Sequence, residues 1–181
     1  RGTATMSDLV TPASLREAAI AQADAYYLDD GHAYGCAETA FMTLKGIYGL
    51  EDPADASAAM AFNGGIAYSG GPCGALTGAA MAVGLLAEQR ISDHRRAKSV
   101  ARELVHDTMR AFEAEHGAVD CRALIGYDLR APGEHDAFIE SGLWREACAA
   151  QIRTVVSHLA VLADEKAWEV ALRRVEARPA T

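Results

Sequence analysis

Hydrophobic residues recur at three- and four-residue intervals along most of the chain, which is the spacing of one face of an α-helix. The clearest case is the segment from Asp93 to Glu115, whose apolar residues form one stripe between charged faces. Similar spacing predicts helices from about Ser14 to Tyr27, from Cys36 to Gly49 and from Trp144 to Leu162. The pattern is typical of a helical bundle.

One further segment, from Ala75 to Leu86, is apolar on every side. A helix without a polar face is enclosed by other elements, and its many Gly and Ala residues allow neighbours to pack closely. It follows a glycine-rich stretch, Asn63 to Gly74, which predicts a loop with unusual backbone dihedrals. Short helices are predicted over Ala56–Phe62 and Cys121–Ile125, with a polar loop through Pro132 and Gly133.

These elements predict an all-α, single-domain helical bundle around a central Gly/Ala-rich helix. A length of 181 residues suits one domain. Alanine is abundant and favours helices, because it loses almost no side-chain entropy there. Residues 1–5 are interpreted as a cloning remnant, residues 6–163 as the helical domain, and residues 164–181 as a charged C-terminal helical tail.

Charge and hydropathy narrow the classes of partner. The formal net charge is -8, and no run of Lys or Arg offsets it, so neither a nucleic-acid surface nor an anionic membrane is an expected partner. No apolar stretch reaches the roughly 20 residues that span a bilayer, and the N-terminus has no signal pattern. We expect a cytoplasmic protein and, since symmetric dimers are the commonest oligomers, a homodimer.

The four cysteines carry the candidate chemistry. The chain has no G-x-S-x-G, H-E-x-x-H or Walker sequence, so known hydrolase machinery is not visible. Disulfides are rare in a reducing cytosol, which favours a metal, cluster or redox role for cysteines. The alternative is that each cysteine is a small buried hydrophobic residue.

Three of the cysteines, Cys36, Cys73 and Cys121, fall at predicted helix starts. The positive end of the helix dipole and the free N–H groups there lower a thiol pKa and favour thiolate. Cys148 lies in the middle of the last long helix, on its inward stripe. His32, four residues before Cys36, is a weaker candidate ligand.

The spacing of the cysteines leaves two kinds of chemistry open. The chain has no C-x-x-C pair, as zinc knuckles and thioredoxin-type enzymes have. Widely spaced cysteines can ligate an iron–sulfur cluster if the fold brings four thiolates together. They can equally form two redox-active dithiol pairs.

The glycine-rich stretch resembles a known signature. The run from Gly70 to Ala79, preceded by Phe62 to Ile66, is similar to the signature of the C_GCAxxG_C_C family of redox-active proteins. Gly35-Cys36-Ala37-Glu38 resembles the part of the signature around the family's first cysteine. Cys121 and Cys148 look like its third and fourth.

The resemblance covers about residues 14–162 and implies a helical redox domain. Its functional set would be Cys36, Cys73, Cys121 and Cys148. A related domain occurs in split-Soret cytochromes, which carry haem and an iron–sulfur centre. This chain has no C-x-x-C-H sequence, so covalent haem is not expected, and Tyr68 stands where relatives often carry a basic residue.

The leading hypothesis is an electron-transfer protein whose four cysteines ligate a [2Fe–2S] or [4Fe–4S] cluster; oxidoreductase activity is left open. Backbone N–H groups of the glycine loop, at Gly71 and Gly74, would bond to the cluster sulfurs. The partner would be a redox protein or a small-molecule electron donor or acceptor.

The second hypothesis is a thiol–disulfide oxidoreductase or redox sensor. Cys73 and Cys36 would be its catalytic residues, with Cys73 as the attacking thiolate. The third is a non-catalytic dimerisation module with buried structural cysteines.

Overall fold

The computed structural model describes residues 11–178 of the chain. The regular secondary structure of these residues is helical. Residues 1–5, interpreted as a cloning remnant, lie outside these described residues. Within the described part no β-strand is formed, and one isolated antiparallel bridge joins Pro72 to Asp120. The predicted all-α class is therefore confirmed.

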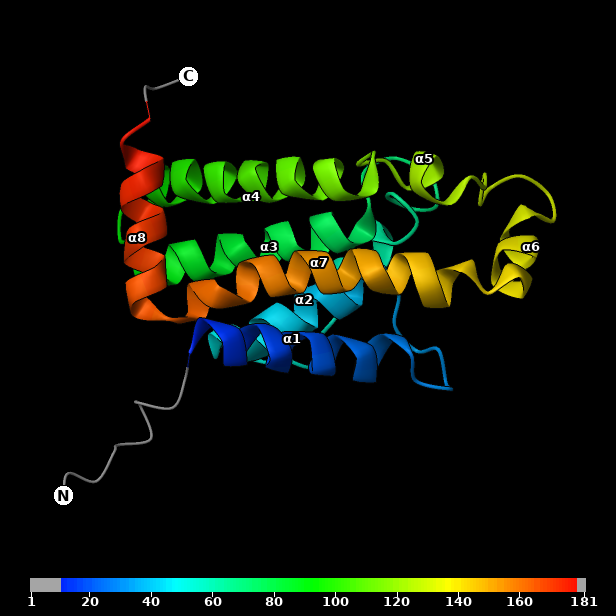
Figure 1. Cartoon of the computed structure of the whole chain (residues 1–181), viewed down its shortest axis with the longest axis horizontal. Coiled ribbons are helices and arrows are strands. Elements are labelled where there is room, and N and C mark those ends of the chain that lie inside the picture. Colours follow the sequence, from blue (N-terminus) through cyan, green and yellow to red (C-terminus); the bar gives the residue numbers. More distant parts are fainter. Residues whose placement is uncertain (1–10, 179–181) are drawn as a thin grey trace.

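The elements follow one another with short connections. In chain order they are α1 (Pro12–Tyr27), α2 (Cys36–Tyr48), the 3₁₀ helix η2 (Ser57–Phe62), α3 (Gly74–Arg90), α4 (His94–His116), α5 (Cys121–Ile125), α6 (Glu134–Ser141), the π-helix η3 (Trp144–Cys148), α7 (Ala149–Ala160), the 3₁₀ turn η4 (Val161–Ala163) and α8 (Glu165–Glu176). The long helices α1, α3, α4 and α7 run side by side, α8 crosses one end, and α5 and α6 lie at the other end (Figure 1).

The helix boundaries follow from capping residues in the sequence. Thr11 accepts a hydrogen bond from the N–H of Ser14 at the start of α1, and Asp93 accepts one from Arg96 at the start of α4. Gly49 and Gly117 end α2 and α4 in the left-handed conformation, which glycine adopts at little cost. These local signals explain why the long helices could be predicted.

The central helix α3 packs almost backbone to backbone against α2. A Cβ atom at Gly78 would overlap the carbonyl oxygen of Ala37, so only glycine permits this approach. Most of α3 is buried, as its composition predicts. It is not enclosed on every side, however, because Leu85 is 46 % exposed on the outer face.

Two elements near the cysteines differ from the prediction. Residues expected to continue a polar loop after Gly133 form α6, which buries Phe138. The first turn of the predicted last helix is the π-helix η3, whose wider turn buries both Trp144 and Cys148. Neither feature has a strong local signal, because α6 is short and a π turn differs from an α turn by a single residue.

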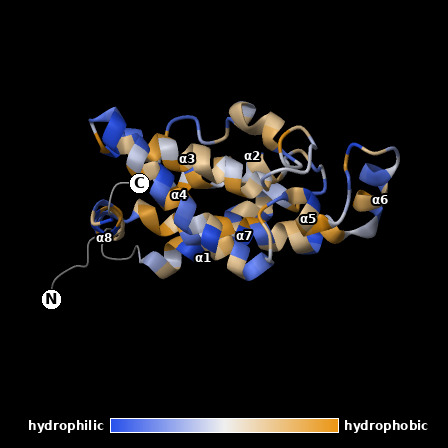
Figure 2. Ribbon diagram, turned by 90° about the horizontal axis from the view of Figure 1, so that it is seen from above, coloured by the Kyte–Doolittle hydropathy of each residue, from blue (hydrophilic) through white to orange (hydrophobic). Residues whose placement is uncertain are grey.

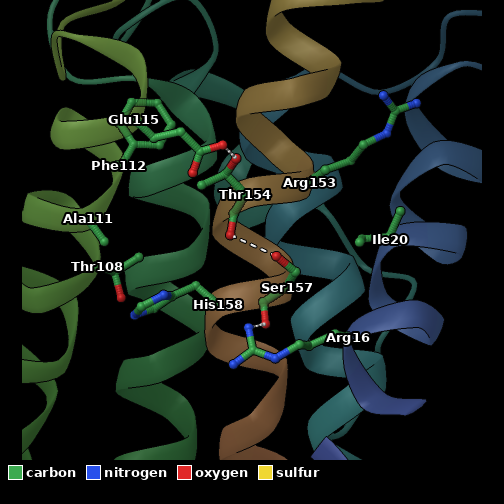
Figure 3. Close-up of a pocket in the computed structure, with 10 residues that line it drawn as sticks. All are labelled: Arg16, Ile20, Thr108, Ala111, Phe112, Glu115, Arg153, Thr154, Ser157 and His158. Carbon is green, nitrogen blue, oxygen red and sulfur yellow. Dashed lines mark hydrogen bonds between the residues drawn. The ribbon is translucent and has the colours of Figure 1, made fainter. Parts of the chain in front are cut away.

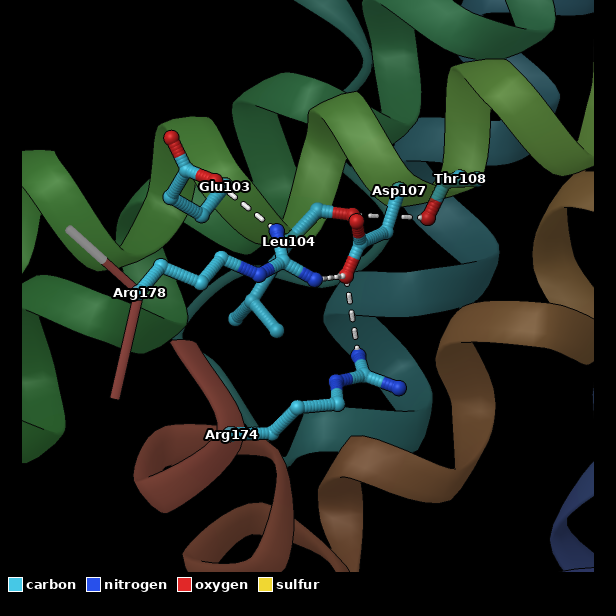
Figure 4. Close-up of polar contacts among 6 residues, drawn as sticks. All are labelled: Glu103, Leu104, Asp107, Thr108, Arg174 and Arg178. Carbon is cyan, nitrogen blue, oxygen red and sulfur yellow. Dashed lines mark hydrogen bonds and ion pairs between the residues drawn. The ribbon is translucent and has the colours of Figure 1, made fainter. Parts of the chain in front are cut away.

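The C-terminal helix α8 packs across the end of the bundle through its buried Trp168 and an ion-pair network with α4. Asp107 accepts hydrogen bonds from Arg174 at 3.0 Å and Arg178 at 2.8 Å (Figure 4). Arg178 also donates to Glu103 at 2.8 Å.

Hydrophobic and hydrophilic residues both occur along each of the helices α4 and α7, as amphipathic helices require (Figure 2). Among the described helices, none is both long and apolar enough to cross a bilayer.

Candidate functional site

The four cysteines lie near one another at the end of the bundle that carries α5 and α6. They come from the first residue of α2, the residue before α3, the first residue of α5 and the last residue of η3. Each lies close enough to the others for a charge on one sulfur to raise the pKa of a neighbouring thiol. All four are free thiols. The structure thus brings together the four residues that the sequence singled out.

The bridge between Pro72 and Asp120 holds the starts of α3 and α5 side by side. The N–H of Cys73 donates to the carbonyl of Val119 at 2.8 Å, and the N–H of Cys121 donates to the carbonyl of Gly71 at 2.7 Å. This pairing links segments almost fifty residues apart. These two backbone hydrogen bonds place Cys73 and Cys121 in the same site.

Asn63 fixes the start of α2 and with it Cys36. Its side-chain oxygen accepts a hydrogen bond from the N–H of Ala37 at 2.9 Å and lies 3.8 Å from the sulfur of Cys36. Its side-chain nitrogen donates to Glu38 at 2.8 Å, and the same carboxylate oxygen accepts from the N–H of Gly35 at 2.9 Å. Asn63 is not among the site residues predicted from the sequence, although it directly precedes the paired glycines of the loop.

Backbone N–H groups surround the sulfur of Cys36. Burial raises the pKa of this thiol, while the N–H groups of Gly64, Ala37, Cys36 itself and Gly74 act in the opposite direction. A Cβ atom at Gly74 would overlap this sulfur, so the absence of a side chain there makes room for it. Gly74, predicted to contact the cofactor, therefore lies directly against a candidate ligand.

Gly71, the other glycine predicted to contact a cofactor, is used within the loop. Its N–H donates to the carbonyl of Gly65 at 3.1 Å, while its carbonyl accepts from Cys121. Its observed contribution is to position Cys121.

Burial determines the protonation of the remaining thiols. It raises the pKa of Cys73 well above the ordinary value, and the neighbouring sulfur of Cys36 raises it further. Burial and the charge of Cys36 also raise the pKa of Cys121 and of Cys148, each to about 12. The prediction that a helix start lowers the pKa of Cys73 is wrong in sign, because the N–H of Ala75 offsets only part of the desolvation.

Two further polar side chains contact the thiols. The hydroxyl of Tyr27 lies beside the thiol of Cys148 and opposes part of the rise in its pKa, and the side-chain oxygen of Gln151 lies 3.7 Å from the sulfur of Cys73. The ring of Tyr27 packs edge-on against Trp144, with centroids 5.8 Å apart. Gln151 could have been identified from the sequence, because it is an amide beside the apolar stripe of the last helix. Nothing in the sequence around Tyr27 marks it as a site residue.

The glycine loop contains a left-handed turn. Five consecutive residues, 64–68, have φ between 51° and 72°, and three of them are not glycine. A left-handed residue with a Cβ costs about 1–2 kcal/mol, and Ile66 is β-branched, which makes the conformation rarer still. The predicted unusual dihedrals are therefore confirmed, and the strain is located beside the cysteines.

A cavity of about 420 Å³ opens beside the cysteines. Cys36, Cys121 and Cys148 line it, while Cys73 lies behind them and is 3 % exposed. His32 also lines the cavity and packs its ring on Trp144, with centroids 4.5 Å apart. Among the described residues, no three His, Cys, Asp or Glu side chains are grouped as ligands of one metal ion.

A second cavity, of about 370 Å³, lies between α1, α4 and α7 and contains no cysteine among its described lining residues (Figure 3). Its polar groups bond to one another. Thr154 donates to Glu115 at 3.0 Å, and Arg16 donates to the carbonyl of Ser157 at 3.0 Å. We therefore interpret it as a groove between helices whose polar side chains form hydrogen bonds within the protein.

Comparison with known proteins gives one match. The family model C_GCAxxG_C_C, described as "Putative redox-active protein", matches residues 34–162, a range that includes all four cysteines. No curated protein matches the chain, and no solved structure matches it.

Proposed function

The chain belongs to the C_GCAxxG_C_C family of redox-active proteins, and from that premise we propose that its four cysteines ligate an iron–sulfur cluster in an electron-transfer protein. The observation that carries this proposal is the grouping of four free thiols from four different elements at one end of the bundle. Cysteine thiolates are the usual ligands of such clusters. A bound cluster would supply one-electron transfer.

The raised pKa values support metal ligation. Four neighbouring thiols cannot all ionise in a buried site, because each thiolate would be desolvated and would repel the others. A cationic metal centre removes both penalties, and a coordinating thiol then loses its proton. The closeness that keeps these thiols neutral by themselves is also what four ligands of one cluster require.

The surroundings of Cys36 also fit a cluster. Backbone N–H groups near the sulfur are the donors that stabilise a negatively charged cluster–thiolate unit. The space that Gly74 leaves open would be filled by any side chain.

The second candidate is thiol–disulfide exchange by the same residues. The closeness of Cys36 and Cys73 favours it, since a charge on the sulfur of Cys36 raises the pKa of Cys73. The raised pKa of every thiol opposes it, because the attacking species in exchange is the thiolate. We therefore rank it below the cluster.

Anaerobic reconstitution of the full chain with iron and sulfide tests the proposal. We expect a visible charge-transfer spectrum that Cys73→Ser and Cys148→Ser abolish and that Ala160→Ser keeps. Ala160 is a matched control, because it is fully buried but lies at the far end of α7. A chain that stays colourless, or a spectrum that survives both cysteine substitutions, would overturn the proposal. The homodimer and the cytoplasmic location stay predictions, which gel filtration and cell fractionation check.

A further inference from the structure

The cavity beside the cysteines has the size and position of a small-molecule site. Its volume of about 420 Å³ lies within the range of ligand pockets, roughly 300–1,000 Å³. Three of the four cysteines line it, so a molecule inside would lie against their sulfurs. Such a molecule would be within direct electron-transfer range of the site.

The charge of the lining excludes most redox nucleotides. None of the described residues that line the cavity is Lys or Arg, and Glu38 is the only Asp or Glu among them. One oxygen of this carboxylate already accepts hydrogen bonds from Gly35 and Asn63. The phosphate groups of a flavin or nicotinamide nucleotide would find no Lys or Arg here, only the imidazoles of His32 and His135, and burying an unpaired charge is costly. The fitting ligand is uncharged.

Aromatic rings favour a planar ligand. The rings of Trp144 and His32 meet at an angle of 81° on one side, and Tyr68 packs against His135 with centroids 5.3 Å apart on another. All four residues line the cavity. Aromatic faces and edges bind flat rings well.

The strained turn supplies an independent reason to expect a ligand here. It holds Tyr68 at a φ of 62°, where the side chain is 43 % exposed and lines the cavity. Arg130 donates to the carbonyl of Ala67 at 3.0 Å and so helps to keep the turn in place. Strained backbone persists where surrounding contacts enforce it, and it gathers at binding sites.

Hydroxyl groups at the cavity could bind ring oxygens. Tyr34 and Tyr68 both line it, and neither hydroxyl bonds to another described residue. From the volume, the absence of Lys and Arg among the described lining residues, the aromatic rings and these hydroxyls, we propose that the cavity binds a neutral molecule of the quinone class. Its role as small-molecule electron partner rests on the proposed function, whereas its binding does not require the cluster.

Equilibrium dialysis of the full chain against 2,3-dimethyl-1,4-naphthoquinone tests this binding. The two methyl groups block the ring positions to which thiols add, so retention reports reversible binding. We expect one saturable site per chain, and at least about tenfold weaker binding of the 6-carboxylate of the same quinone, because no Lys or Arg is among the described residues that line the cavity. Absence of saturable binding, or equal affinity for the two compounds, would overturn the proposal.

A pair of substitutions locates the site. Ile139 lines the cavity and is 46 % exposed, so the larger side chain of Ile139→Trp should occupy part of the cavity without disturbing the packed core of the bundle. Val170, on α8 at the other end of the bundle, is 58 % exposed and provides the control Val170→Trp. We expect the first to weaken binding about tenfold and the second by less than about twofold. Equal effects of the two would place the quinone elsewhere.

Dialysis on both the iron-free and the reconstituted chain separates the two proposals. Quinone binding by a chain that takes up no iron would overturn the cluster proposal and support the quinone site. A chain that takes up iron but binds no quinone in either form would overturn the quinone site and support the cluster proposal.

Discussion

The hydroxyl of Tyr27 lies beside the sulfur of Cys148, where it opposes part of the rise that burial causes in the pKa of that thiol. Both groups are buried, and the pKa of Tyr27 is raised by burial and by the nearby sulfurs, so the phenol stays protonated and remains a donor. Hydrogen bonds to ligating sulfurs stabilise the reduced, more negative state of a cluster. Tyr27 is therefore a positioning and tuning residue for the proposed centre.

Replacing Tyr27 by Phe should lower the reduction potential of the reconstituted chain. A hydrogen bond worth about 1 kcal/mol corresponds to roughly 40 mV for a one-electron couple. The control is Tyr26→Phe, because Tyr26 is the adjacent residue and its hydroxyl accepts a hydrogen bond from Gln22 instead. Redox titration measures both. A potential that rises, or that shifts equally in the two variants, would contradict this role of Tyr27.

Two glycines of α3 provide a matched pair. A Cβ atom at Gly74 would overlap the sulfur of Cys36, while at Gly84 no described atom lies within 4 Å of the added group. We expect Gly74→Ala to cost about 1–3 kcal/mol and to reduce cluster content. Gly84→Ala should instead raise the free energy of unfolding by roughly 0.5–1 kcal/mol. Urea unfolding and iron analysis check both, and a Gly74→Ala chain with unchanged iron content would show that the clearance has no role.

Asn63 should matter for stability as well as for the site. Asn63→Ala leaves the N–H of Ala37 without its partner and removes one of the two hydrogen bonds to the carboxylate of Glu38, so we expect a loss of roughly 1–2 kcal/mol. Gln22→Ala removes a half-buried amide that bonds to Tyr26 far from the loop, and its effect should be under about 0.5 kcal/mol. Urea denaturation compares the two. Similar losses would mean that Asn63 does not hold the start of α2.

The iron-free chain should lose stability in alkali. The thiols of Cys121 and Cys148 have a pKa of about 12 in the folded chain, against an ordinary value of 9.0. Above pH 9 the unfolded chain therefore releases these protons while the folded chain keeps them, so stability falls as the pH rises from about 9 to about 12. Below pH 9 these thiols contribute no slope. Urea unfolding at several pH values and thiolate absorbance measure this; thiolate formation in the folded chain near pH 8 would contradict it.

The sequence predicted the parts of the structure that have local causes. Thr11, Asp93 and Gly117 set helix ends through their own chemistry, and the glycines of residues 63–74 predicted the unusual backbone. The placement of Cys36, Cys73 and Cys121 at helix starts is likewise read from neighbouring residues. These features need no knowledge of the rest of the fold.

Features that depend on distant segments were not predictable. The bridge from Pro72 to Asp120 joins two loops, and the approach of Tyr27 to Cys148 brings together residues of α1 and η3. The sign of the pKa shift at Cys73 depends on how many segments cover it, whereas the helix dipole that suggested a lowered pKa is local. Desolvation is a property of the packed core, which a linear pattern does not display.

The most direct test of the central claim is the iron and acid-labile sulfide content of the full chain purified without oxygen. We predict iron and sulfide in equal amounts, both lost together in Cys36→Ser and both retained in Ala160→Ser. A folded chain that contains neither element under these conditions, or that keeps both after Cys36→Ser, would contradict a cluster held by the four cysteines.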